Sequence, residues 1–235
     1  MKMIIAPSKT MHKTAQKGTT APLFQPQQET LLQTLQRMDE NALLSLFNIK
    51  DKKIAQLNYA RFQDFKEDNH ALFAYSGHQF KFLDAENLDE ESLHYLDQRL
   101  YIMSGLYGLI RPSDSIGLYR LPMGLKLNNE PLKYNWIKPL SDYLVGETVL
   151  NLASKEYSDA LDKKRVHVVD VDFYPDQTLK RKVPAMEAKK LRGLMVRHMA
   201  LNRVKTLEGI KRLSFNDYRY LANVSNPKRL VFVKR

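Results

Sequence analysis

The pattern of apolar and polar positions along the chain predicts short buried strands separated by amphipathic helices. Short apolar runs predict strands at residues 2–6, 71–75, 100–103, 148–153, 165–173 and 230–233. Apolar residues that recur every three or four positions predict helices at residues 29–38, 40–47, 51–65, 89–99, 136–144, 186–203 and 206–213. Because strands occur at the start, middle and end of the chain, we expect a single α/β (α+β) domain over residues 1–235, with a mixed sheet flanked by helices.

The predicted helix at residues 186–203 divides into an apolar and a basic arc at about 100° per residue. The apolar arc contains Ala188, Leu191, Leu194, Met195, Met199 and Leu201, and the basic arc contains Lys189, Lys190, Arg192, Arg197 and Arg203. Gly193 lies within the basic arc, where glycine costs roughly 1 kcal/mol of helix stability relative to alanine. We therefore expect an anionic partner to come closest to this helix at Gly193. The alternative is an amphipathic helix whose basic face is simply solvated.

The net charge of the chain is unevenly distributed. The formal charge is +11, and residues 180–235 hold 16 lysines and arginines against three acidic residues. The remaining 179 residues are close to neutral, with 21 basic and 23 acidic residues. A basic region on a near-neutral body is typical of a protein that binds nucleic acid. The alternative is that the body folds back and partly neutralises this region.

Several classes of protein are excluded or disfavoured by what the sequence lacks. The chain has no cysteine, which excludes a disulfide scaffold, a thiolate metal site and a cysteine nucleophile. It has no apolar stretch of membrane-spanning length and no secretory signal, so we expect a cytoplasmic protein with no membrane partner. His167, Asp170 and Asp172 alternate along one predicted strand, but His167 stands alone. We therefore expect no metal site and no cofactor.

Small polar and basic residues follow three of the predicted strands, at residues 8–10, 104–111 and 151–155. If these strands are neighbours, the three groups meet at one edge of the sheet, which the helix at 186–203 can cover. Lysine and arginine there suit a phosphate backbone, and Tyr107, Tyr119 and Tyr157 are candidates for stacking on exposed bases. The predicted nucleic-acid-binding residues are Lys9, Arg111, Arg120, Lys155, Lys189, Arg192 and Arg197.

An enzyme acting on a nucleotide or a nucleic-acid base is the alternative function. Its polar pocket would be lined by Lys9, Asn151, Lys189 and Arg192, and its candidate catalytic residues are Ser8, Lys9, Asn151, Ser154, Tyr157 and Lys189. Lys9 or Lys189 would act as a base if burial lowered its pKa. A deep closed pocket at the strand ends would favour this chemistry, whereas an open trough as wide as a duplex would favour binding.

Several short segments, in a characteristic order along the whole chain, resemble the YaaA family of peroxide-stress proteins. They are APSKT at residues 6–10, MSGLYGLIRP at 103–112, YRLPMG at 119–124, NLASKEY at 151–157, KKLRGLM at 189–195 and LVF at 230–232. The chain departs from the family pattern at Gly77-His78, where an acidic residue is usual in place of the histidine. An acid–base or metal role at that position is therefore doubtful.

The resemblance implies a single domain with a closed, cantaloupe-like fold and a basic cleft. It also implies an intracellular protein of the oxidative stress response that protects DNA from hydrogen peroxide and limits free iron. The implied partner is duplex or branched DNA, bound with little sequence specificity. Direct sequestration of iron is disfavoured, because the chain lacks cysteines, histidine pairs and Glu-x-x-His motifs.

Overall fold

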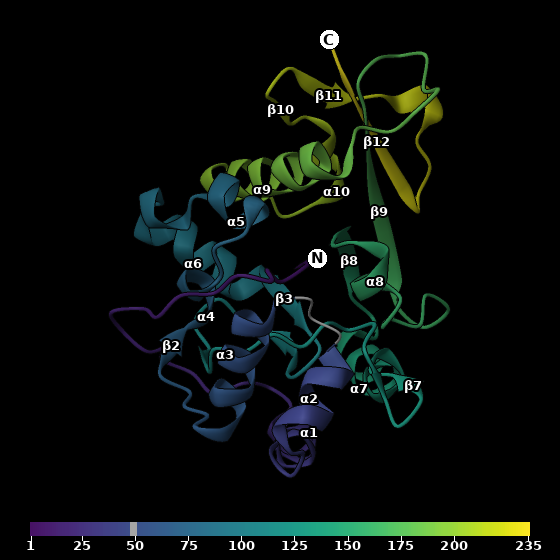
Figure 1. Cartoon of the computed structure of the whole chain (residues 1–235). Coiled ribbons are helices and arrows are strands. Elements are labelled where there is room, and N and C mark those ends of the chain that lie inside the picture. The colour runs from purple at the N-terminus through teal and green to yellow at the C-terminus, as the bar shows by residue number, and fades with distance from the viewer. Residues whose placement is uncertain (48–50) are drawn as a thin grey trace.

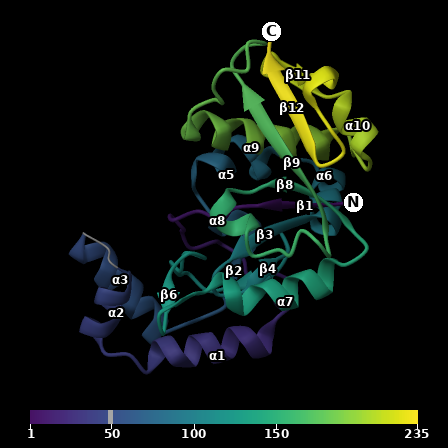
Figure 2. The ribbon, with the colours of Figure 1, turned by 90° about the vertical axis from the view of Figure 1, so that its right-hand side faces the viewer.

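An eight-stranded mixed sheet forms the centre of the computed structural model, which describes residues 1–47 and 51–235. The strand order is β10-β11-β12-β9-β8-β1-β3-β4, and Figure 2 shows the strands from β12 to β4 arranged one below the other. The strands of this sheet are β1 (Lys2–Ile5), β3 (Leu100–Ser104), β4 (Gly108–Ile110), β8 (Thr148–Leu152), β9 (His167–Tyr174), β10 (Ser214–Phe215), β11 (Tyr218–Tyr220) and β12 (Arg229–Lys234). Two small two-stranded sheets pair β2 (Asn69–His70) with β5 (Ser115–Ile116) and β6 (Lys126–Leu127) with β7 (Glu130–Pro131).

Helices surround this sheet, as the sequence pattern predicts. They are α1 (Gln25–Gln36), α2 (Glu40–Phe47), α3 (Lys52–Gln63), α4 (Ala71–Ala74), α5 (His78–Leu83), α6 (Glu90–Arg99), α7 (Lys133–Leu144), α8 (Lys155–Ser158), α9 (Ala185–Leu201) and α10 (Leu207–Lys211). Helices α5, α6 and α9 pack together, α1 to α3 form a separate layer, and α7 packs against β4 (Figure 1). None of the helices in the described parts of the chain has the length and apolar character needed to cross a bilayer.

The sheet order places a topological switch point beside β1. Strands β3, β1, β8, β9 and β12 are parallel, and β1 lies between β3 and β8. Met3, Ile4 and Ile5 are fully buried, which explains why the sequence of β1 is a continuous apolar run. The chain passes from β1 to β3 on one side and later adds β8, β9 and β12 on the other. In such sheets ligands bind where the order reverses, beyond the carboxyl ends of the strands, which here means β1 and β8.

The predicted strand at residues 71–75 is wrong. Residues Ala71–Ala74 form the single helical turn α4, and Tyr75 makes an isolated bridge to Met11. A buried apolar run of this length fits a strand or a buried helical turn equally well, so periodicity does not distinguish them. The other predicted strands and helices are present, with shifted ends. Asp51 and Asp89 cap helices α3 and α6 by accepting hydrogen bonds from amides of their first turns.

The interpretation of Gly193 as the place of closest approach by an anionic partner is also wrong. Gly193 is buried, and a Cβ atom built on it would lie 2.2 Å from the carbonyl oxygen of Gln79 and 3.0 Å from the amide nitrogen of Leu83. The close neighbour is therefore helix α5 of the same chain. The buried face of α9 includes Leu191, Gly193 and Met195, so the glycine belongs to the packed side of the helix.

Candidate functional site at the carboxyl ends of β1 and β8

A cavity of about 200 Å³ lies at the switch point, and we call it the strand-end cavity. Its walls come from the loop after β1, the start of α5, the loop before β6, the start of α8 and the first half of α9. The lining residues are Ala6, Pro7, Ser8, Lys9, Gly77, His78, Gln79, Phe80, Pro122, Ser154, Glu156, Tyr157, Lys189 and Arg192. The predicted meeting of the residues after β1 and β8 with the basic helix is confirmed, whereas residues 104–111, the third predicted group, do not line this cavity.

Three cations border this cavity. Lys9 and Lys189 are exposed, and neither forms an ion pair with any residue in the described parts of the chain. Arg192 is half-buried, and its buried Nε atom lacks a hydrogen-bond partner among the described residues. Burial lowers the pKa of Arg192, with Asp172 and Asp170 opposing the shift, but an arginine side chain remains charged. The site therefore presents positive charge that few carboxylates neutralise.

Neutral and acidic groups complete the walls. The Ser8 hydroxyl lies 3.1 Å from the Thr10 hydroxyl and packs so closely on Gly77 that a Cβ there would be 2.2 Å from Ser8 Oγ. One carboxylate oxygen of Glu156 accepts a 3.2 Å hydrogen bond from the Gly124 amide. Burial raises the pKa of Tyr157, and Glu156 adds to the rise, so the phenol stays protonated and can donate a hydrogen bond.

A second cavity of about 380 Å³ adjoins the first through Arg192, and we call it the Arg192–Arg229 cavity. It is lined by Asn151, Ala153, Lys155, Ser158, Asp159, Lys163, Asp170, Val171, Asp172, Lys182, Arg192 and Arg229. Asp170 accepts hydrogen bonds from Asn151 at 2.7 Å and Lys163 at 3.1 Å, and Asp172 pairs with Lys182 at 2.7 Å.

The structure divides the predicted enzymatic residues between these two cavities. Ser8, Lys9, Ser154, Tyr157 and Lys189 line the strand-end cavity, whereas the side chain of Asn151 belongs to the other. Asn151 also uses its amide to bind Asp170 and its oxygen to accept a bond from Ala153 at 2.9 Å. Lys155, a predicted phosphate-binding residue, lines the Arg192–Arg229 cavity as well.

Three other predicted phosphate-binding arginines lie outside both cavities. Arg111 donates to Asp114 at 2.9 Å and to the Ala21 carbonyl at 2.6 Å. Arg197 donates to the carbonyls of Leu83 and Asp84 and forms a 3.1 Å ion pair with Asp84. The Asn58 side chain accepts a hydrogen bond from the Arg120 amide at 2.8 Å and donates one to the Arg120 carbonyl at 3.0 Å. Their role in binding nucleic acid stays a prediction, although Arg111 and Arg197 have structural partners.

Two of the three predicted stacking tyrosines are buried, so that part of the prediction is wrong. Tyr107 is fully buried, and its hydroxyl donates to Glu67 at 2.8 Å. Tyr119 is 4% exposed and bonds to the hydroxyls of Ser104 and Tyr75 at 2.5 and 2.8 Å. Burial raises the pKa of Tyr119 to about 12. The turn between β3 and β4 places Tyr107 in the core, and Tyr119 enters it from the segment after β5.

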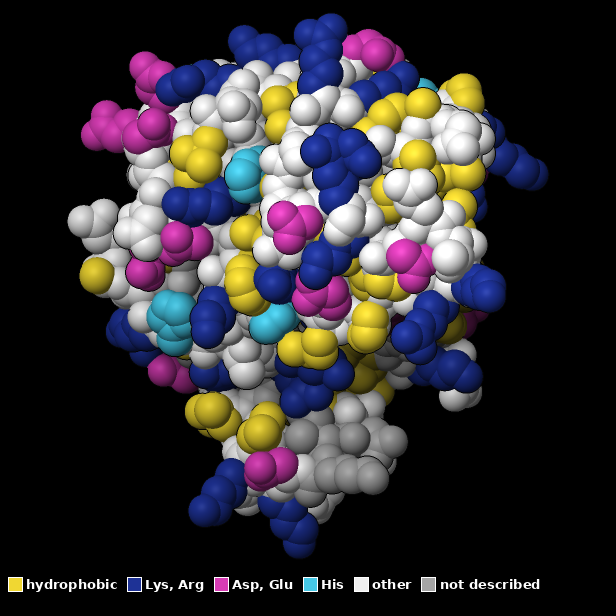
Figure 3. Space-filling model, turned by 90° about the horizontal axis from the view of Figure 1, so that it is seen from above, with side chains coloured by type: hydrophobic (Ala, Val, Ile, Leu, Met, Phe, Trp, Pro, Cys, Tyr) yellow, Lys and Arg dark blue, Asp and Glu magenta, His cyan; other side chains and the backbone are white. Residues whose placement is uncertain are grey.

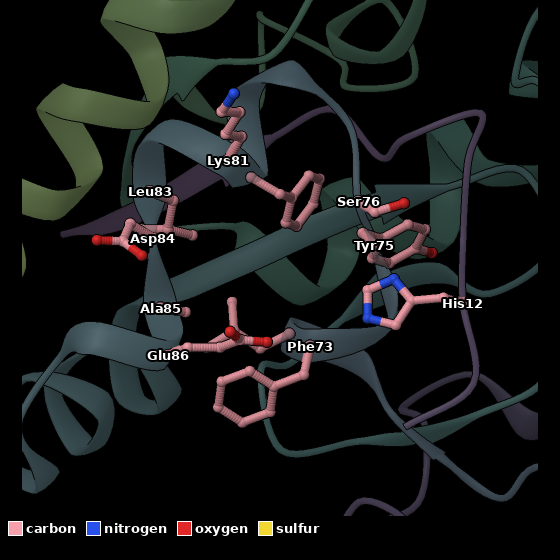
Figure 4. A pocket seen from close by; sticks show the side chains of 11 residues that line it. His12, Phe73, Tyr75, Ser76, Lys81, Leu83, Asp84, Ala85 and Glu86 are labelled. Carbon is pink, nitrogen blue, oxygen red and sulfur yellow. The ribbon is translucent and has the colours of Figure 1, made fainter. Parts of the chain in front are cut away.

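A further cavity, of about 340 Å³, lies beside α4 and α5 (Figure 4). His12, Phe73, Tyr75, Lys81, Asp84 and Glu86 are among its lining residues. The Asp84 carboxylate is bound by Arg197 and by Asn87, at 3.1 and 2.8 Å. None of the residues that the sequence predicts for the site, all of them in the described parts of the chain, lines this cavity.

Sequence reasoning missed His78, Gln79 and Glu156 as lining residues of the strand-end cavity. His78 and Gln79 open helix α5, which the sequence pattern does not predict. Glu156 lies next to Lys155 within the segment NLASKEY. Its position just after the carboxyl end of β8 was the sequence feature that could have indicated it.

The positive charge is not gathered into one uninterrupted patch on the face seen from above. Figure 3 shows lysine and arginine side chains at the rim and the centre of this face, with acidic side chains between them. Anion binding on this face therefore depends more on which individual cations lack an acidic partner than on the total charge of the chain.

The chain is similar to known proteins along its whole length. The family model described as peroxide stress protein YaaA matches residues 1–224. A UPF0246 protein of Rickettsia peacockii is 36% identical over 245 residues, covering 98% of each chain. A UPF0246 protein of Finegoldia magna is 35% identical over 242 residues, covering all of this chain and 98% of that protein. The chain belongs to the peroxide stress protein YaaA family.

Proposed function

We propose that this protein binds duplex or branched DNA during peroxide stress, with little sequence specificity, and thereby protects the DNA. The observation that carries the proposal is the set of cations at the carboxyl ends of β1 and β8. Lys9 and Lys189 are exposed there without an ion-pair partner among the described residues, and Arg192 lies between them and the neighbouring cavity. Phosphate contacts from such residues position DNA without reading its sequence.

Binding to a fluorescently labelled duplex at several salt concentrations tests the proposal. The double substitution Lys9→Glu and Lys189→Glu should weaken binding about tenfold or more on every sequence, because both side chains change from attracting to repelling phosphate. Both residues are exposed, so the variant should fold normally.

The double substitution Lys52→Glu and Lys53→Glu is the matched control, because it also reverses two charges. Both residues are exposed in the first turn of α3 and lie outside both cavities. An acidic residue is favourable in the first turn of a helix, so the control should fold as well as the wild type. Equal affinity of the two double variants would contradict the proposed binding site.

We propose that any effect on free iron is indirect, because the chain has no cysteine to supply a thiolate ligand. DNA-bound protein would keep iron-generated radicals from the backbone without holding the metal. One tightly bound iron per purified chain, measured by elemental analysis, would overturn this part of the proposal.

Catalysis on a nucleotide or a base is the second candidate, and the size of the strand-end cavity favours it. A volume of about 200 Å³ suits a small group far better than a duplex. Glu156 supplies a carboxylate that can act as an acid or a base there. Incubation with nucleosides, nucleotides and damaged duplexes, followed by mass spectrometry, tests it. A new product that disappears in Glu156→Gln would support catalysis, and unchanged substrates would leave binding as the function.

A further inference from the structure

We infer that the two adjoining cavities bind one nucleotide turned out of a DNA helix, with its base in the strand-end cavity and its flanking phosphate in the Arg192–Arg229 cavity. This inference rests on the proposed DNA binding and adds to it a class of preferred substrate, DNA with an unpaired or weakly paired nucleotide. Size, lining chemistry and the position of Arg192 each support it.

The size of the strand-end cavity matches a base better than a whole nucleotide. Its volume of about 200 Å³ is below the roughly 300–1,000 Å³ of sites for drug-sized ligands. A heterocyclic ring fits this space, whereas its sugar and phosphate have to lie outside it. The adjoining cavity supplies that outside space, with about 380 Å³.

The walls of the strand-end cavity suit a planar ring. Pro7, Phe80, Pro122 and Tyr157 supply apolar and aromatic surface of the kind on which bases stack. Glu156 uses one oxygen to accept from the Gly124 amide, and a carboxylate has further acceptor sites for the amino group of a base. A plain phosphate-binding surface would need neither the rings nor the carboxylate.

The Arg192–Arg229 cavity suits a phosphate. The Nε atoms of both arginines are buried and lack hydrogen-bond partners among the described residues. Lys163 and Lys182 are engaged by Asp170 and Asp172. Arg229 lies 4.0 Å from Asp172 and donates one hydrogen bond to the Val224 carbonyl at 3.3 Å. Arg192, Lys155 and the remaining donors of Arg229 are left to meet an anion. Guanidinium groups form charge-assisted hydrogen bonds with phosphate oxygens, and this would satisfy the buried donors.

Arg192 lines both cavities, so groups bound in them would be neighbours across a single side chain. A base and its own phosphate have this relation in a nucleotide. Turning a paired base out of a duplex costs a few kcal/mol, and an unpaired base costs least. The protein should therefore prefer a duplex that already contains one unpaired nucleotide.

Three labelled duplexes of equal length test this preference at one salt concentration. The first is fully paired, the second carries one unpaired cytidine, and the third carries an abasic nucleotide at the same place. We expect about tenfold tighter binding of the cytidine duplex than of the other two, since stacking of a single base supplies this much. The abasic duplex controls for the flexibility that a bulge gives to DNA.

Filling the strand-end cavity with Ser154→Phe should remove this preference, so that the cytidine and abasic duplexes bind equally. Ser45→Phe, at an exposed serine of α2, is the matched control and should keep the preference. If Ser154→Phe does not fold, Arg229→Met offers a second route, because it removes one phosphate donor and should reduce the preference.

Equal binding of the cytidine and abasic duplexes by the wild type would overturn the inference, as would a preference that survives Ser154→Phe. Salt-dependent binding of the paired duplex together with either result would leave the proposed function standing. Absence of binding to all three duplexes would instead contradict the proposed function itself.

Discussion

The two halves of helix α9 carry the same kind of charge but use it differently. In the first half, Lys189 and Arg192 border the strand-end cavity. In the second half, Arg197 bonds to carbonyls at the end of α5. Just beyond the end of the helix, Arg203 pairs with Glu91 of α6. Gly193 separates the halves and lets α5 pack against the helix backbone.

This difference shows that a row of cations on one helix need not form one binding surface. A cation contributes to anion binding when the fold leaves its charge without a partner, and it contributes to stability when carbonyls or carboxylates surround it. Substitutions in the second half of α9 should therefore reduce stability, and those in the first half should reduce binding.

The largest expected effect is on stability, at Gly193. Gly193→Ala should destabilise the protein by about 2 kcal/mol or more, because the new methyl group would lie 2.2 Å from the Gln79 carbonyl oxygen. The roughly 1 kcal/mol gain in helix propensity is too small to offset this overlap. Urea denaturation measures this loss of stability. Met186→Ala, at an exposed position of the same helix, is the control and should change the free energy of unfolding by less than about 0.5 kcal/mol. A stabilised Gly193→Ala protein would disprove the close α5–α9 contact.

Removal of the Arg197 guanidinium should have the next largest effect. Arg197→Met should lower the free energy of unfolding by about 2 kcal/mol, because the carbonyls of Leu83 and Asp84 lose their donor. Asp84 ends α5 in the left-handed conformation, at φ 51°, and the ion pair with Arg197 holds it there. Thermal or urea unfolding measures the loss. Stability equal to the wild type would show that Arg197 is dispensable for packing.

A smaller effect concerns acid stability through His198, which stacks on Phe215 with ring centroids 5.7 Å apart. Burial lowers the pKa of His198, and the neighbouring Arg197 lowers it further. The unfolded chain therefore takes up a proton near pH 6.5 before the folded protein does, and stability falls as the pH drops below that value. Urea unfolding at pH 7.5 and 5.5 should show a smaller difference for His198→Gln than for the wild type. Equal differences would contradict the assignment.

The smallest effect on stability is expected at Lys189. Its side chain is exposed and forms no ion pair with a described residue, so Lys189→Met should change the free energy of unfolding by less than about 0.5 kcal/mol. A loss as large as that of Arg197→Met would show that both halves of α9 serve the fold.

Much of the fold follows from periodicity in the sequence. Apolar runs identify β1, β3, β8, β9 and β12, and the parallel order brings the residues after β1 and β8 together, as predicted. The single turn α4 and the short helix α5 are too brief to give a helical period, which is why they were not predicted as helices.

The partners of individual cations are harder to predict. Asp114 follows Arg111 by three residues, and this spacing was a local signal for their pair. The carbonyl that Arg197 binds at Leu83 lies 114 residues earlier in the chain, and no local pattern indicates it. Gly193 gave a correct signal of close approach, but the sequence does not say that the approaching group is a helix of the same chain.

The salt dependence of DNA binding tests the central claim most directly, through a comparison of Lys189→Met with Arg197→Met. Each phosphate contact contributes roughly −0.9 to the slope of log K against log salt. Lys189→Met should make the slope shallower by about 0.9 with stability unchanged, whereas Arg197→Met should keep the wild-type slope despite its lower stability. The reverse result, a shallower slope for Arg197→Met and an unchanged slope for Lys189→Met, would contradict the account.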